Sequence, residues 1–228
     1  MLKTRQLFDS DSNTYSYLVW DTDSRFAALI DSVQEHVHRD LQLIDELKLN
    51  LLYAFETHIH ADHITGSGEL RKITHAKVVV HKNSGSKCAD ILAEDGDVFF
   101  LGKYAIQVIH TPGHTNTDIC YKIDNAVFTG DTLLVRGCGR TDFQSGSAAQ
   151  LYDSITQKLF TLPDDTDVFP GHDYNGFNSS TIGEEKNYNP RLGGQRNKDA
   201  FIFVMDTLDL APPKRILQAV PGNLKCGQ

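Results

Sequence analysis

The sequence predicts a single α/β domain, and three observations support this prediction. The chain has 228 residues, of which 40% are hydrophobic and 23% charged, so it is long enough to bury a sizeable core. Short β-type runs alternate with segments of helical periodicity. No linker or low-complexity tract divides residues 1–228, and a short tail is expected after the Pro-rich stretch Ala211-Pro212-Pro213.

The first elements are predicted to form a strand pair, a helix and a buried strand. Residues 15–20 and 25–31 are β-type runs separated by turn residues, which indicates an antiparallel pair. Apolar residues recur at helical spacing over residues 36–48, so this segment is expected to be an amphipathic helix. The apolar run 51–55 predicts a buried strand, and residues 64–73 predict a helix.

The second half repeats one pattern, in which a β-rich run ends in a tight Gly or Pro turn that carries a His or Asp. The runs 104–109, 126–128 and 167–169 lead to His114, Asp131 and His172 in this way. Glycine permits the close backbone approach that such turns need. Two helices are also expected, one through Leu151, Ile155 and Leu159 and one over residues 199–208.

The densest group of ligand-type side chains follows the strand predicted at residues 51–55. It reads Thr57-His58-Ile59-His60-Ala61-Asp62-His63, with three imidazoles and a carboxylate in six residues. Imidazole nitrogens and carboxylate oxygens bind divalent first-row metal ions, and a turn at a strand end can bring several of them to one point. A polar surface loop is the alternative, but this spacing after a strand favours a metal site.

Charge and cysteine content exclude several classes of protein. The net charge of −8 argues against nucleic acid or an anionic membrane surface as a partner. No signal peptide, transit peptide or transmembrane run is visible, so a cytoplasmic location is expected. The cysteines lack a paired pattern, and Cys88, Cys120 and Cys226 are expected as free thiols or small buried hydrophobes in a reducing compartment. For Cys138, which lies close to Arg140, contact with a substrate stays open beside a structural role.

The combination HxHxDH, TPGHT, TGDT and PGHD, each after a strand, resembles the metallo-β-lactamase superfamily. The resemblance implies an αββα four-layer sandwich of two mixed β-sheets flanked by helices. Within that superfamily, residues 128–146, with the loop Arg136-Gly137-Cys138-Gly139-Arg140, resemble the persulfide dioxygenases. Residues 172–177, 189–192 and 219–223 extend this similarity over nearly the whole chain.

The persulfide dioxygenase resemblance implies oxidation of glutathione persulfide with O2 and water to sulfite and glutathione. It implies one Fe(II) per chain, held by His58, His114 and Asp131, with His60, Asp62, His63 and His172 surrounding these ligands. It also suggests a homodimer. Glutathione carries two carboxylates, so we expect substrate contacts from Arg140 first, then Tyr174 and Arg191, with an Arg140–Asp142 ion pair as the alternative for Arg140.

Two other functions stay open at this point. The first is a glyoxalase-II-type hydroxyacylglutathione hydrolase with a binuclear metal site, in which the four surrounding residues would bind a second ion. The loop at residues 136–143 and the lack of a longer basic helical tail argue against it. The second is a non-catalytic metal-binding or sulfur-carrying protein, which the complete set of ligands disfavours. The spacing of the residues alone does not decide between one metal ion and two.

Overall fold

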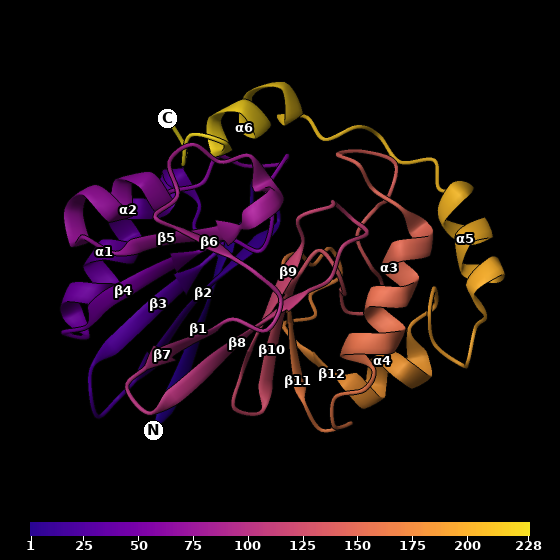
Figure 1. Cartoon of the computed structure of the whole chain (residues 1–228), viewed down its shortest axis with the longest axis horizontal. Helices are drawn as coiled ribbons and strands as arrows, with labels where there is room; N and C mark the ends of the chain where they lie inside the picture. Colours follow the sequence, from indigo (N-terminus) through magenta and orange to yellow (C-terminus); the bar gives the residue numbers. More distant parts are fainter. The chain divides into compact units, whose positions relative to one another are not determined.

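A computed structural model describes residues 1–228 of the chain, which divides into two compact units (Figure 1). The first unit contains Met1–Ala93, Val98–Ile106 and Pro212–Gln228. The second contains Glu94–Asp97 and Gln107–Ala211. The two sheets and their helices are described one at a time below; strand β7 and the start of β8, which pair in the second sheet, belong to the first unit.

The first unit is organised by a six-stranded mixed sheet in the order β1-β2-β3-β4-β5-β6. Its strands are β1 (Leu2–Asp9), β2 (Thr14–Asp21), β3 (Phe26–Ile30), β4 (Asn50–Phe55), β5 (Lys77–His81) and β6 (Ile91–Ala93). Strands β1 to β3 pair antiparallel, as predicted for β2 and β3, whereas β3 to β6 run parallel. The parallel strands β3 and β4 therefore end at the same edge, where the HxHxDH turn begins.

Two helices cover this sheet, because each has one apolar face to bury. Helix α1 (Val37–Glu46) follows a short 3-10 turn at Gln34–His36, and α2 (Ser67–Thr74) follows the HxHxDH turn. Val37, Ile44 and Leu70 pack against Leu29 and Leu51 of the strands in one apolar cluster. The helix predicted over residues 36–48 is thus confirmed, and the helix predicted at residues 64–73 begins three residues later.

The second sheet has the order β12-β11-β10-β9-β8-β7. Its strands are β7 (Val98–Leu101), β8 (Tyr104–His110), β9 (Ile119–Ile123), β10 (Ala126–Gly130), β11 (Asp167–Pro170) and β12 (Ser180–Thr181). Before this sheet begins, a short 3-10 turn at Lys82–Ser84 connects β5 to β6 of the first sheet. Strand β10 pairs parallel with β11 and antiparallel with β9, so this sheet is also mixed. Strands β8, β10 and β11 each lead into one of the predicted ligand-bearing turns.

The helices of the second unit are α3 (Ala148–Ser154), which continues as a π-helical turn at Ile155–Leu159, α4 (Ile182–Tyr188) and α5 (Lys198–Asp206). Leu151, Ile155 and Leu159 are fully buried, as their spacing predicts. They pack with Val127 of β10 and Phe201 of α5 in the apolar cluster of this unit. No helix of the structure is long and apolar enough to cross a membrane.

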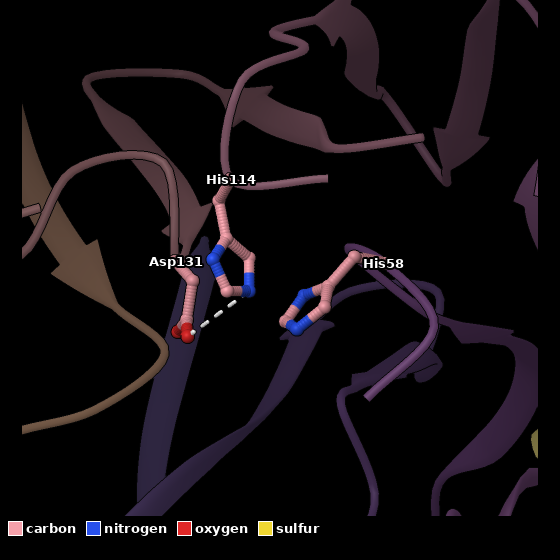
Figure 2. A group of neighbouring side chains, drawn as sticks. All are labelled: His58, His114 and Asp131. Carbon is pink, nitrogen blue, oxygen red and sulfur yellow. Dashed lines mark ion pairs between the residues drawn. The ribbon is translucent and has the colours of Figure 1, made fainter. Parts of the chain in front are cut away.

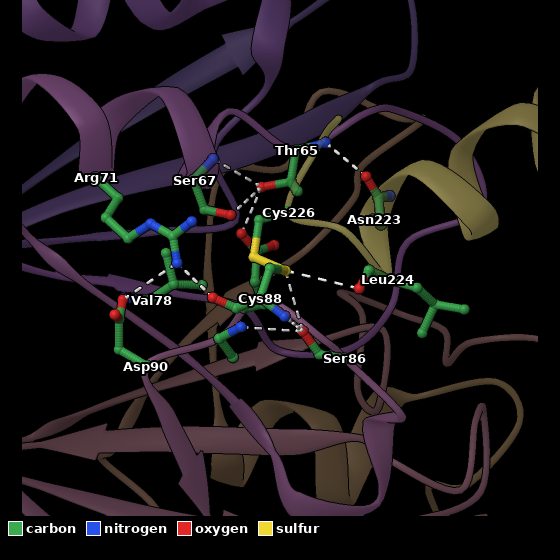
Figure 3. Close-up of a disulfide and its surroundings, with 12 residues drawn as sticks. Thr65, Ser67, Arg71, Val78, Ser86, Cys88, Asp90, Asn223, Leu224 and Cys226 are labelled. Carbon is green, nitrogen blue, oxygen red and sulfur yellow. Dashed lines mark hydrogen bonds and ion pairs between the residues drawn. A yellow bond between two sulfur atoms is a disulfide. The ribbon is translucent and has the colours of Figure 1, made fainter.

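The C-terminal tail forms helix α6 (Ile216–Asn223) in the first unit, and a disulfide follows it. Cys226 is bonded to Cys88, which lies 138 positions earlier in the sequence (Figure 3). The prediction of free thiols is therefore wrong for Cys88 and Cys226. Nothing in their local sequence indicates pairing, because only the return of the tail brings them together. Cys120 is free and buried, as predicted, and Cys138 is also a free, buried thiol.

The tail also contacts the turn that carries the HxHxDH motif. The side chain of Asn223 donates to the carbonyl oxygens of His60 and His63, at 2.9 Å each, and accepts from the Thr65 N–H at 2.9 Å. The Gly68 N–H donates to the carbonyl oxygen of Cys226 at 3.1 Å. These bonds satisfy buried polar groups of the turn, so the tail is part of its support.

We predict that removing the disulfide destabilises the protein. It closes a loop of 138 residues, and links of this kind restrict the unfolded chain, with typical contributions of about 2–4 kcal/mol. Urea unfolding of the double variant Cys88→Ser/Cys226→Ser should show a loss of that size. The wild-type protein measured in reductant should match the variant, and an unchanged free energy of unfolding in both would contradict the prediction.

Candidate metal centre

His58 lies directly after strand β4, on a turn that a buried carboxylate holds in place. Asp31, which follows β3, accepts hydrogen bonds from the Thr57 N–H at 2.7 Å and the Thr57 hydroxyl at 2.8 Å. The Thr57 hydroxyl lies 3.0 Å from Nδ1 of His58. The parallel pairing of β3 with β4 explains the arrangement, because it brings the ends of the two strands to one sheet edge.

His60 is buried between two carboxylates rather than facing outward. Its Nε2 lies 3.0 Å from Asp31 Oδ1 and 3.2 Å from Glu56 Oε2. Burial disfavours the charged imidazolium, but the neighbouring carboxylates outweigh it and raise the pKa of His60 well above its usual range. His60 therefore belongs to a buried ionic cluster with Asp31 and Glu56.

His63 and Asp62 form a second pair on the same turn. Nδ1 of His63 lies 2.8 Å from Asp62 Oδ2, which also accepts a hydrogen bond from the Thr14 hydroxyl at 2.9 Å. Nε2 of His63 is buried and has no hydrogen-bond partner. The turn thus brings His60, Asp62 and His63 together, as the sequence predicts, and leaves one ring nitrogen of His63 available to a ligand.

In the second unit, His114 and Asp131 come together from the turns after β8 and β10. His114 Nε2 lies 3.6 Å from Asp131 Oδ2 (Figure 2). His172, from the turn after β11, places Nε2 3.5 Å from Asp131 Oδ1. His114 Nδ1 lies 2.7 Å from the carbonyl oxygen of Arg140, which can only accept, so this nitrogen carries the proton and Nε2 is the basic atom.

Two glycines are required by the close packing of these turns. A Cβ at Gly139 would lie 2.4 Å from the carbonyl oxygen of Asp131 and 2.8 Å from the His114 ring. A Cβ at Gly171 would lie 2.7 Å from Asp131 Oδ1. Side chains at these positions would therefore displace the candidate ligands, which explains Gly171 of the PGHD turn and Gly139 of the loop at residues 136–143.

Arg140 forms the ion pair that was expected as its alternative role. Its Nε and Nη2 donate to the two oxygens of Asp142 at 2.7 Å each, and its guanidinium also donates to the carbonyl oxygens of Leu210 and Ala211. The hydrogen bond from Arg140 lowers the pKa of Asp142. The guanidinium lies 4.5 Å from the centre of the Phe143 ring. Arg140 therefore accepts a hydrogen bond from the His114 ring with its backbone carbonyl and forms an ion pair with Asp142 through its side chain.

The other expected substrate contacts lie in different surroundings. The Tyr174 side chain is 68% exposed, and its ring is nearly parallel to that of His172, with centroids 6.0 Å apart. Arg191 is half-buried, and its Nη1 donates to the carbonyl oxygen of Cys138 at 2.8 Å. Cys138 itself is buried beside Met205, which favours a structural role for its thiol.

The donor atoms of these turns fit a metal ion. Asp131 Oδ1 and His63 Nε2 are buried without a hydrogen-bond partner, and such atoms are costly unless a ligand or ion satisfies them. Imidazole nitrogen combined with carboxylate oxygen suits iron or zinc. The turns of each unit therefore offer buried donor atoms that a divalent metal ion could bind.

Comparisons with known proteins decide the family. Residues 10–172 match the model of the metallo-β-lactamase superfamily. The persulfide dioxygenase ETHE1, mitochondrial, of Homo sapiens is 48% identical over 226 residues, which are 98% of this chain and 88% of that protein. The chain belongs to the persulfide dioxygenases of the metallo-β-lactamase superfamily. The crystal structure of ETHE1 from Myxococcus xanthus agrees, with a TM-score of 0.96 at 54% identity over 99% of this chain and 100% of that one.

Family membership confirms the predicted fold class, an α/β metallo-β-lactamase fold with two mixed sheets flanked by helices. It also confirms that the chain is an oxidoreductase of the dioxygenase type. The glyoxalase-II-type alternative corresponds to a more distant relative. The hydroxyacylglutathione hydrolase of Maricaulis maris is 35% identical over 172 residues, covering 74% of this chain and 65% of that protein.

Four polar residues that the motifs alone did not indicate support the ligand-bearing turns. Three of them are Asp31, Thr57 through its hydroxyl, and Asn223. A fourth, Asp118, accepts from the Thr115 N–H and hydroxyl at 2.7 Å each, and burial raises its pKa to about 6. A threonine beside a ligand histidine at positions 57–58 and 114–115 was the available signal, because such a hydroxyl needs a buried partner.

We predict that the two free thiols are unreactive in the native protein. Burial raises the pKa of Cys120 to about 12 and that of Cys138 to about 11, so at pH 8 almost none of either thiol is in the reactive thiolate form. Iodoacetamide followed by mass spectrometry should show no labelling of the native protein at pH 8. Both thiols should be labelled in guanidinium, and rapid native labelling of Cys138 would contradict the prediction.

Proposed function

We propose that this persulfide dioxygenase binds one Fe(II) per chain through His58, His114 and Asp131. Each residue offers one ligand atom, an imidazole nitrogen or a carboxylate oxygen. Two imidazoles and one carboxylate would hold the ion, and a bound Fe(II) would supply redox chemistry toward O2. We further propose that residues 1–228 act as one metallo-β-lactamase-fold domain.

The observation that carries this proposal is the paired orientation of His114 and Asp131. Proton donation from His114 Nδ1 to the Arg140 carbonyl turns the basic Nε2 toward Asp131, whose Oδ1 has no hydrogen-bond partner. Such fixed rings and unsatisfied carboxylates are typical of metal-ligand sets. His58 completes the set by motif match with the family.

The proposed reaction converts glutathione persulfide, O2 and water into glutathione and sulfite. When bound, Fe(II) supplies the one-electron chemistry that activates O2, which no side chain here can provide. The protein's own residues position the persulfide and hold the ligand turns. Water supplies the third oxygen of sulfite, and the persulfide sulfur–sulfur bond breaks as the thiol of glutathione is released.

We propose that Arg140, Tyr174 and Arg191 bind the peptide part of glutathione. The bidentate pair of Arg140 with Asp142 has the geometry that Arg forms with any carboxylate, so Asp142 occupies the position that a substrate carboxylate could take. Tyr174 is exposed beside His172 and can donate from its hydroxyl. A homodimer and a cytoplasmic location remain proposals from the sequence.

Metal analysis tests the proposed iron site. Protein produced with iron should hold about one Fe per chain, as one set of three ligands implies, and should consume O2 only when a persulfide is added. Asp131→Ala should lose the iron, because it removes the only carboxylate of the set. Two tightly held zinc ions together with S-lactoylglutathione hydrolysis would instead support the glyoxalase-II-type function.

Arg140→Ala tests the proposed substrate contact. Loss of a charged hydrogen-bonded pair costs about 1.5–3 kcal/mol, so KM for glutathione persulfide should rise about 10–100-fold with little change in kcat. Asp142→Asn is the matched variant, since it weakens the competing carboxylate and should lower KM. Iron loss in Arg140→Ala, or the same KM in both variants, would show that Arg140 only supports the fold.

A further inference from the structure

Buried Asp31 is not among the residues that the proposed function uses, yet three donors converge on its carboxylate. They are the N–H and the hydroxyl of Thr57 and Nε2 of His60. The backbone of Asp31 is fixed as well, because its N–H donates to the Phe55 carbonyl oxygen at 2.9 Å and its carbonyl accepts from the Ser16 hydroxyl at 2.6 Å.

The backbone at Asp31 is unusual for its position at a strand end. Its φ is +52°, in the left-handed region that costs a non-glycine residue free energy, although Asp tolerates it better than most. The residue is 1% exposed. A buried acid in this conformation indicates that the direction of its side chain matters, and the side chain points at the residue preceding His58.

The number of protons that each group carries fixes the direction of the hydrogen bonds from His58 through Thr57 to Asp31. A carboxylate has no proton to give, so the single hydroxyl proton of Thr57 goes to Asp31 Oδ2. The Thr57 oxygen is then an acceptor toward His58 Nδ1, which lies 3.0 Å away. Nδ1 of His58 must therefore carry the ring proton, and Nε2 is left as the basic nitrogen.

We propose that Asp31 is a positioning residue that sets the tautomer of His58 through the Thr57 hydroxyl, so that Nε2 is the atom available to iron. This inference rests on the proposed role of His58 as an iron ligand. A carboxylate that supports a metal-ligand histidine in this way fixes the orientation of the ring and makes the ligand nitrogen more basic. Here the hydroxyl of the preceding residue transmits the effect.

The variant Asp31→Asn reverses the direction of the proton chain. The amide oxygen takes the Oδ1 position, where two donors converge, and the NH2 group takes the Oδ2 position and donates to the Thr57 oxygen. The Thr57 hydroxyl can then donate only to His58 Nδ1, which moves the ring proton to Nε2. A nitrogen that carries a proton cannot bind metal.

Two measurements test this proposal. The first is the tautomer of His58 in the metal-free protein, read from its ring nitrogen shifts by long-range 1H–15N NMR. We expect Nδ1–H in the wild type and Nε2–H in Asp31→Asn. The second is the affinity for Fe(II), measured anaerobically by competition with a chelator, which should fall about 10–100-fold in Asp31→Asn.

Thr57 variants separate the proposed relay from a merely structural role. Thr57→Val removes the hydroxyl at nearly constant shape and should weaken Fe(II) binding about 10-fold, whereas Thr57→Ser keeps the hydroxyl and should bind as the wild type does. In the Thr57→Val background, Asp31→Asn should add little further loss. An equal loss in both backgrounds would mean that Asp31 acts through other contacts and would overturn the proposal.

Asp118→Asn is the matched control. Asp118 holds Thr115, the neighbour of His114, by the same pair of bonds from N–H and hydroxyl. However, His114 Nδ1 contacts the Arg140 carbonyl oxygen rather than the threonine, so the His114 tautomer should stay unchanged in Asp118→Asn. A tautomer change at His114 in this variant would show that the substitution acts nonspecifically.

His58→Ala distinguishes failure of this inference from failure of the proposed iron site. If His58→Ala keeps its iron, His58 is not a ligand and the proposed function is wrong in that assignment. If His58→Ala loses iron but Asp31→Asn leaves the His58 tautomer as Nδ1–H, the ligand assignment stands and the relay is excluded.

Discussion

The constraint on which the rest of the structure depends is that each proposed imidazole ligand must be held through Nδ1. His58 and His114 meet it in different ways, one through the hydroxyl of the preceding Thr57 and the other through the backbone carbonyl of Arg140. The Thr57 hydroxyl is fixed by Asp31 at the end of the neighbouring strand, and the Arg140 carbonyl comes from the loop after the Asp131 turn. The folded sheets supply this rigidity, because a loop alone would leave the rings free to rotate.

The sequence predicted the turns well because local chemistry determines them. Apolar runs followed by Gly or Pro and a single His or Asp mark strand ends, and His114, Asp131 and His172 come from three such turns, of which the structure brings His114 and His172 to Asp131. Sequence patterns could not show which distant residues support the turns. Asp31 lies 26 residues before Thr57, and Asn223 lies 160 residues after His63.

The disulfide was missed for the same physical reason. Cys88 and Cys226 become neighbours only when the C-terminal tail folds back on the first unit. The composition of the tail, which begins with Pro212 and Pro213, does not indicate that it folds back. Arg140 is the intermediate case. Its partner Asp142 is two residues away and could be foreseen, whereas its bonds to Leu210 and Ala211 could not.

The buried carboxylates also bear on how many metal ions the proposed site holds. A binuclear site would draw on His60, whose Nε2 lies between Asp31 and Glu56 in a buried ionic cluster, while its Nδ1 is buried without a hydrogen-bond partner. His63 keeps one ring nitrogen without a partner, so the turn alone is not closed to a second ion. Asp31 and Glu56 therefore hold the His60 ring by Nε2 and leave Nδ1 available to a ligand, so the proposal of a single ion rests on His58, His114 and Asp131 and not on His60.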